Sequence, residues 1–65
     1  MKLIVNGTAV ESAAVSLADV LDDLGKSDAK VATAVNEAFV PAGQRGTHIL
    51  HEGDRIEIVA PRQGG

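Results

Sequence analysis

Polar and hydrophobic residues alternate at the start of the chain, in the run KLIVNGTAVE. Leu3 and Val5 fall on one face of a predicted strand, and Ile4 falls on the other. The dipeptide Asn6-Gly7 stands between two β-prone runs and is typical of a tight type I′ turn, because both central residues of that turn need a positive φ. The pattern therefore predicts an opening β-hairpin.

The spacing of hydrophobic residues then changes from two to three and four, in VSLADVLDDLG. Ser16 is suited to cap the N-terminus of a helix there, and Gly25 can adopt the left-handed conformation that ends it. Asp19 stands where a capping box prefers Glu or Gln, so we expect that part of the cap to be weak. Positions i, i+3, i+4 and i+7 give this short amphipathic helix one apolar stripe, formed by Leu17, Val20, Leu21 and Leu24.

Residues of high β propensity return in KVATAVNEAFVP, with a second turn predicted at Asn36-Glu37 and a stop at Pro41. Residues 42–47, AGQRGT, form a predicted loop. The HIL run that follows fits either a short strand or a single helical turn, and the pattern does not decide between them.

The last hydrophobic run, DRIEIVA, follows a turn that we predict around Gly53. Ile56 and Ile58 alternate there with residues expected on the opposite face, which predicts a final strand. The order of elements is therefore a hairpin, a helix, one or two strands and a final strand, which is an α+β arrangement.

One helix packed across one face of a mixed four- or five-stranded sheet is the economical way to bury the helical stripe. If the final strand pairs beside the first, it lies in the middle of that sheet. The residues that we expect to form the core are Leu3, Val5, Leu17, Val20, Leu21, Leu24, Val35, Ile56 and Ile58.

The chain has 65 residues, of which 45% are hydrophobic, one is aromatic and none is cysteine. A chain of this size forms one domain with a modest core and has no room for an enclosed active site. We expect this domain to span residues 1–60 and a flexible tail to span residues 61–65. The lack of cysteine excludes disulfides, thiolate zinc sites and cysteine nucleophiles, so the fold must depend on aliphatic packing.

The formal net charge is −3, with acidic residues spread along the chain. Nucleic-acid binding needs a basic face or aromatic platforms, and the sequence offers neither. The N-terminal run lacks the long apolar region of a signal peptide, and no apolar run approaches the roughly 20 residues of a membrane span. We therefore expect a cytoplasmic protein without a nucleic-acid or membrane partner.

The sequence also lacks the residue patterns of catalytic and metal sites. His48 and His51 lie three residues apart beside Glu52, but a metal site needs three or four convergent ligands, so we expect solvated or capping histidines. The run GQRG lacks the spacing and the Lys-Ser/Thr pair of a phosphate-binding loop. We expect no catalytic residue, no metal site and no cofactor bound by the chain itself.

The C-terminal run PRQGG is poorly suited to packing or to a central strand. Pro61 lacks an amide hydrogen, and Gly64 and Gly65 have no side chains. Residues 61–65 reach roughly 17 Å when extended, at about 3.3–3.6 Å per residue. Such a segment could carry a C-terminal carboxylate through a narrow channel into the active site of another protein.

The runs MKLIVNG, AVNEAFVP and EGDRIEIVAPRQGG resemble the thiamine-biosynthesis sulfur carrier family (ThiS) over essentially the whole chain. The strongest part of the resemblance is the joint presence of these runs and the terminal Gly-Gly at the right separations. It implies the ubiquitin-like β-grasp fold, which agrees with the order of elements predicted above. One departure is Glu37, which stands where members of the family often carry glycine.

The resemblance implies a covalent carrier, not an enzyme. An adenylating activating enzyme would use ATP and magnesium to adenylate the carboxylate of Gly65, and sulfur would then replace the adenylate to give a thiocarboxylate. Gly64, Gln63, Arg62 and Pro61 would complete the segment inserted in the partner's active site, although Arg62 is equally well explained as a solvated surface charge.

The other implied partners are a sulfur donor, such as a cysteine desulfurase system, and thiazole synthase, which would use the sulfur to build the thiazole ring of thiamine. Ile4 and Val59 are candidates for docking the activating enzyme, because they lie on the predicted sheet face away from the helix. Isolated hydrophobic residues on a surface are also normal without any function.

Three alternatives to this function stay open at this point. The first is the small subunit of molybdopterin synthase or another ubiquitin-like sulfur carrier, although the molybdopterin proteins are usually longer. The second is a ubiquitin-like modifier whose glycine becomes attached to lysines of other proteins. The third is a passive β-grasp binding module whose glycines are only a frayed end.

Overall fold

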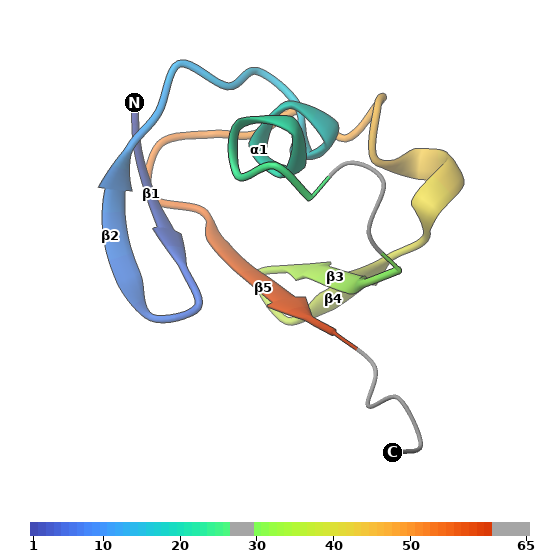
Figure 1. Ribbon diagram of the computed structural model, residues 1–65. Coiled ribbons are helices and arrows are strands. Elements are labelled where there is room, and N and C mark those ends of the chain that lie inside the picture. Colours follow the sequence, from blue (N-terminus) through green and yellow to red (C-terminus); the bar gives the residue numbers. More distant parts are fainter. Residues whose placement is uncertain (27–29, 61–65) are drawn as a thin grey trace.

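The computed structural model describes residues 1–26 and 30–60, and the predicted tail of residues 61–65 lies outside that part of the chain. Within it, one α-helix lies over one face of one sheet, which makes two layers (Figure 1). The strands are β1 (Lys2–Val5), β2 (Thr8–Glu11), β3 (Ala32–Val35), β4 (Ala38–Val40) and β5 (Arg55–Val59), and the helices are α1 (Leu17–Asp23) and the 3₁₀ helix η1 (Ala42–Gln44).

The five strands form a mixed sheet in the order β2-β1-β5-β3-β4. β1 and β5 run parallel, whereas the β1–β2, β3–β4 and β3–β5 pairs are antiparallel. The prediction that the final strand pairs beside the first and lies centrally is therefore confirmed. β5 joins two hairpins that are far apart in the sequence.

Both hairpins turn through two residues with positive φ. The first turn contains Asn6 at 48° and Gly7 at 83°, and the second contains Asn36 at 51° and Glu37 at 73°. Asparagine adopts this left-handed region more readily than most residues because its short side chain can hydrogen-bond locally. The two predicted turns are confirmed, and the second one places a glutamate where the backbone favours glycine.

Helix α1 begins with a complete capping box. The Ser16 hydroxyl accepts a hydrogen bond from the Asp19 N–H over 3.3 Å, and the Asp19 carboxylate accepts from the Ser16 N–H over 3.1 Å. The same carboxylate oxygen accepts from the N–H of Val15 over 3.1 Å. We expected this part of the cap to be weak at Asp19, but both hydrogen bonds of the capping box are present because the shorter acidic side chain still reaches the Ser16 N–H. Gly25 follows the helix with a φ of 72°, as predicted.

The core lies between α1 and the sheet, and it differs from the predicted core at a few positions. Leu24 is 47% exposed, so its assignment to the core was wrong. Helix α1 ends at Asp23, which leaves Leu24 as the C-cap residue beyond the last helical turn. Val5 is half-buried and packs against the core. The buried hydrophobic residues are Leu3, Ala14, Leu17, Val20, Leu21, Val35, Val40, Leu50, Ile56 and Ile58.

A polar contact inside the protein holds the η1 loop to β3. Thr33 is 1% exposed, and its hydroxyl donates to the Val40 carbonyl oxygen over 2.8 Å. The same hydroxyl accepts from Nε of Arg45 over 3.0 Å, and Nη2 of Arg45 donates to the Val31 carbonyl oxygen over 2.6 Å. Arg45, which follows η1, therefore supplies a donor to the buried Thr33 hydroxyl.

The segment after this loop is neither a regular strand nor a helical turn. Ile49 forms an isolated antiparallel bridge with Ser16. The N–H of Leu50 donates to the Val15 carbonyl oxygen over 2.9 Å, and the buried Leu50 side chain belongs to the core. The segment is thus held against the start of α1.

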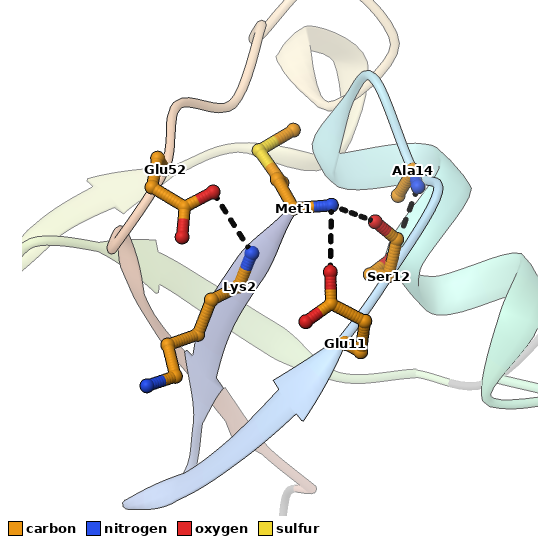
Figure 2. Close-up of polar contacts among 6 residues, drawn as sticks. All are labelled: Met1, Lys2, Glu11, Ser12, Ala14 and Glu52. Carbon is orange, nitrogen blue, oxygen red and sulfur yellow. Dashed lines mark hydrogen bonds and ion pairs between the residues drawn. The ribbon is translucent and has the colours of Figure 1, made fainter.

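Polar contacts also hold the start of β1 to neighbouring loops (Figure 2). The N–H of Lys2 donates to Oε1 of Glu52 over 3.0 Å, which ties β1 to the turn before β5. The N-terminal ammonium group of Met1 donates to the Ser12 carbonyl oxygen over 2.6 Å and forms an ion pair with Glu11 at 3.2 Å. β1 is therefore fixed at the end where it enters the sheet.

In the part of the chain that the structure describes, no helix has the length and apolar character needed to cross a membrane.

Candidate functional site

The residues predicted to carry the chemistry, Pro61, Arg62, Gln63, Gly64 and Gly65, lie outside the described part of the chain. The structure does describe the strand that leads to them. β5 ends at Val59 and is followed by the exposed Ala60. β5 is therefore the last regular element before the predicted tail.

β5 is anchored on one face by the core. Ile56 is fully buried and Ile58 is 8% exposed, whereas Arg55, Glu57 and Val59 are exposed. This alternation confirms the predicted final strand, because side chains two residues apart share one face. The described part of the chain therefore ends just after a central strand that two buried side chains anchor in the core.

The two predicted docking residues share a face of the sheet but do not lie together. Val59 is 59% exposed and pairs with Ala32 of β3. Ile4 is only half-buried and pairs with Arg55, at the opposite end of β5 from Val59. Both are on the face away from α1, because their sequence neighbours Leu3 and Ile58 are buried.

The exposed aromatic residue Phe39 lies on this same outer face and was not among the predicted docking residues. Phe39 is 69% exposed and pairs with Ala34, which in turn pairs with Glu57 of β5. The turn at Asn36-Glu37, which was predicted from the sequence, is the feature from which the position of Phe39 could have been predicted. That turn fixes the hairpin register, and the register places Phe39 opposite to the buried Val40.

We define the outer patch as the apolar residues that this register gathers on the face away from α1 near the end of β5. Its larger members are Val59 and Phe39, and the smaller Ala32 and Ala34 lie between them in β3. Exposed hydrophobic residues that are contiguous mark interaction sites more often than scattered ones do. The outer patch is therefore a better candidate docking surface than the pair Ile4 and Val59.

Charged residues border the outer patch. A shallow hollow of about 400 Å³ is lined by Ala34, Glu37, Arg55 and Glu57. Nη2 of Arg55 lies 3.7 Å from a carboxylate oxygen of Glu37, and both side chains are more than half exposed. Such an exposed pair contributes little to stability but gives the surface a pattern of charge that a partner can read.

A second hollow, of about 330 Å³, lies on the helix side of the sheet. It is mainly apolar because most of its lining is aliphatic. The lining residues are Leu3, Val5, Val10, Val20 and Leu24, together with Glu11, Ser12 and Asp23. It separates the end of α1 from the first hairpin and contains no member of the outer patch.

The backbone groups of both histidines form hydrogen bonds that hold local structure. The His48 carbonyl oxygen accepts from the Leu17 N–H over 3.0 Å, and the His51 N–H donates to Oδ2 of Asp54 over 2.8 Å. Burial of Asp54 raises its pKa, but the hydrogen bonds from His51 and Asn36 outweigh that effect and leave the pKa below its ordinary value. Among residues 1–26 and 30–60, no three His, Asp or Glu side chains gather into a metal-binding group.

Comparisons with known proteins identify the fold. The model of the ThiS family matches residues 3–65. The crystal structure of a thiamine biosynthesis protein (ThiS) from Geobacter metallireducens is similar over 100% of both chains, with a TM-score of 0.84 and 22% sequence identity. At this identity the likeness shows the fold alone, and it confirms the predicted β-grasp. A search of curated proteins finds no match.

Proposed function

The chain belongs to the ThiS family of sulfur carriers in thiamine biosynthesis, and we propose that it carries sulfur as a thiocarboxylate on Gly65. The observation that supports this most directly is the extent of the family match, which runs to residue 65 and so includes Gly64 and Gly65. The anchored central strand β5 also supports it, because a rigid strand is a suitable base for a segment that reaches into another protein.

The proposed chemistry starts from the C-terminal carboxylate of Gly65. This group has an ordinary pKa of about 3.3–3.7, so it is ionised at neutral pH and is a poor electrophile. Its oxygen attacks the α-phosphorus of magnesium-bound ATP on the activating enzyme, and pyrophosphate leaves. The terminal sulfur of a persulfide, supplied by a donor such as a cysteine desulfurase system, then attacks the carbonyl carbon and AMP leaves. A thiol cleaves the S–S bond of the resulting acyl disulfide, which releases the thiocarboxylate and leaves the donor and the thiol joined as a disulfide.

The resulting thiocarboxylate is a soft nucleophile that thiazole synthase accepts as its sulfur source. In this scheme the chain supplies no catalytic group. The cofactors, ATP and magnesium, are bound by the activating enzyme. A shared reaction requires a shared compartment, and we propose that this compartment is the cytoplasm. Pro61, Arg62, Gln63 and Gly64 occupy the channel that leads to the activating enzyme's nucleotide site.

We propose further that the outer patch docks the activating enzyme. Only Ala60 separates Val59 from residues 61–65, so contact at Val59 brings the partner close to the start of the tail. Phe39 extends the contact across β3, and the charges of Arg55 and Glu57 set the orientation. Ile4 of β1 lies beside the start of β5, far from the tail, and contributes less than Val59 does.

The proposed covalent chemistry is tested by intact-mass measurement. The purified chain is incubated with the activating enzyme, magnesium and ATP, and a sulfide source, and we expect a mass gain equal to replacing one oxygen with sulfur. A variant that lacks Gly65 should show no gain, because its carboxylate is one residue short of the reacting position. An unchanged mass of the full chain would refute the proposal, and conjugates to lysines of other proteins would favour a modifier.

The docking role is tested by steady-state kinetics of activation. Val59→Asp and Phe39→Asp should each raise KM roughly tenfold or more, because an apolar contact worth about 1.5–3 kcal/mol is lost. Ile49→Asp is the matched control, since Ile49 is 51% exposed but lies beside the start of α1. Equal effects of all three substitutions would exclude the outer patch as the docking surface.

The thiazole synthase step is tested with the purified thiocarboxylate form. We expect it to supply sulfur for thiazole formation and to give no sulfur transfer to a molybdopterin precursor. Neighbouring genes give an independent test, because a thiazole synthase gene beside this one supports the proposal, whereas molybdopterin genes there would favour the alternative sulfur carrier.

A further inference from the structure

The side chain of Asn6 forms two hydrogen bonds to the backbone of one residue near the end of β5. Its Oδ1 accepts from the Ile58 N–H over 2.8 Å, and its Nδ2 donates to the Ile58 carbonyl oxygen over 3.1 Å. An N–H only donates and a carbonyl only accepts, so the partners fix the orientation of the carboxamide. The residues are 52 positions apart in the sequence.

These bonds replace a strand partner that β1 no longer provides. The parallel pairing of β1 with β5 extends to Val5, and the N–H of Asn6 donates to the Ile56 carbonyl oxygen over 2.8 Å. The chain then turns away at Asn6-Gly7. Backbone groups two residues apart point to the same side of a strand, so Ile58 also presents its N–H and carbonyl toward the β1 side. The carboxamide satisfies both groups.

We infer that Asn6 is a positioning residue that fixes where the rigid part of β5 ends, and hence the length of chain between the domain and Gly65. This inference rests on the proposed function. With Asn6 in place, β5 is held at Ile58 by the carboxamide on one side, and at Val59 by Ala32 of β3 on the other. Val59 of the outer patch is the next residue, so the same contact orients it.

The length of the free segment matters because it sets the effective concentration of Gly65 in the partner's active site. Each residue released from β5 adds up to about 3.3–3.6 Å of reach. Once a tether exceeds the distance it must span, effective concentration falls roughly as the −3/2 power of its length or more steeply. Loss of the Asn6 contact therefore lowers the rate of activation within the docked complex.

Asn36 provides a matched control within the same protein. It also occupies the first position of a two-residue turn, with a φ of 51°, and its Oδ1 accepts from a β5 backbone N–H, that of Arg55, over 3.0 Å. Arg55 is the first residue of β5, whereas Ile58 is near the last. The two asparagines thus share turn chemistry and a β5 contact but hold opposite ends of the strand.

The test compares Asn6→Gly with Asn36→Gly in the full chain. Glycine adopts positive φ readily, so both variants keep the turn and lose the carboxamide. We measure urea unfolding, amide hydrogen exchange at Ile58, and kcat and KM for ATP–pyrophosphate exchange with the activating enzyme. Both variants should lose stability. Only Asn6→Gly should speed amide exchange at Ile58 roughly tenfold beyond the change expected from that shared loss, and only Asn6→Gly should lower kcat, by up to about twofold.

A second variant, Asn6→Asp, keeps the size and the turn preference of the side chain and removes the Nδ2 donor. A carboxylate oxygen then faces the Ile58 carbonyl, so we expect the same direction of change in kcat. Equal kcat for the Asn6 and Asn36 variants, or unchanged exchange at Ile58, would overturn the positioning role alone. A wild-type chain that supports no ATP–pyrophosphate exchange would overturn the proposed function and this role with it.

Discussion

The carboxamide of Asn36 donates through Nδ2 to Oδ1 of Asp54 over 3.0 Å, which joins the turn of the second hairpin to the turn before β5. The other oxygen of Asp54 accepts from the His51 N–H over 2.8 Å. The carboxylate therefore works in its charged form as an acceptor for two loops that are distant in sequence.

This arrangement predicts a specific dependence of stability on pH. The pKa of Asp54 is lowered in the folded protein, and so is that of Asp19, chiefly through the hydrogen bonds from the Ser16 and Val15 N–H groups. A lowered pKa means that the unfolded chain binds protons more readily. The resulting stabilisation is present above the ordinary value of 3.8 and is lost as the pH falls through the folded pKa.

Urea unfolding measured from about pH 6 down to about pH 2 checks this prediction. We expect Asp54→Asn and Asp19→Asn each to be less stable than wild type at pH 6 and to show a shallower loss of stability on acidification. Variant curves that run parallel to the wild-type curve throughout would show that these two carboxylates do not cause the acid sensitivity.

The buried Thr33 hydroxyl is predicted to be important for stability despite its small size. Thr33→Val keeps the shape of the side chain but removes the hydroxyl that accepts from Nε of Arg45 and donates to the Val40 carbonyl oxygen. We expect a loss of about 1–3 kcal/mol in the free energy of unfolding, measured by urea denaturation. Thr8→Val makes the same chemical change at an exposed position of β2 and should leave stability within about 0.5 kcal/mol of wild type.

Glu37→Gly is predicted to stabilise the protein. Glu37 has a φ of 73°, a region that is unfavourable for residues with a Cβ by about 1–2 kcal/mol. Glycine removes that strain but makes the unfolded chain more flexible, so we expect a net gain of about 0.5–1 kcal/mol in thermal or urea unfolding.

Glu37→Gln separates this backbone effect from the ion pair with Arg55. It keeps the side chain and its strain and removes only the charge, so stability should change by less than about 0.5 kcal/mol because the pair is exposed. A destabilised Glu37→Gly variant beside a similarly destabilised Glu37→Gln variant would show that the ion pair dominates this turn.

Leu50 and Leu24 are predicted to differ strongly although both are leucines. Leu50→Ala removes a side chain that is 3% exposed and should reduce the free energy of unfolding by about 2–5 kcal/mol. Leu24→Ala removes one that is 47% exposed and should cost less than about 1 kcal/mol. A larger loss for Leu24→Ala would mean that the hollow on the helix side is closed in solution.

The same two leucines show what the sequence could and could not predict about the fold. Leu24 fits the helical period, but a periodic pattern assumes that the helix continues, and α1 ends one residue earlier. Leu50 lies in an irregular segment whose burial depends on contacts with Val15 and Ser16, so no local period marks it. The hairpins, by contrast, depend on local turn chemistry and were predicted correctly.

The candidate site also contains some residues that the sequence alone identifies and others that only the sheet register reveals. The terminal glycines can be recognised from the sequence directly, because their chemistry depends on composition and position alone. Phe39 can be placed on the outer face only by combining the turn at Asn36-Glu37, which sets the register of β3 and β4, with the position of Val35 in the core. The contact between the Asn6 side chain and Ile58 can be predicted only from the parallel register of β1 and β5, which joins residues from opposite ends of the chain.

The central position of β5 also determines when the sheet can form during synthesis of the chain. The two hairpins are synthesised first, yet in the described sheet they share no edge, and only β5 bridges them. A nascent chain that has not yet extended past residue 59 therefore presents two open strand edges with no partner between them. We expect cooperative folding to wait for β5, so that the strand bearing the tail is also the one that completes the fold.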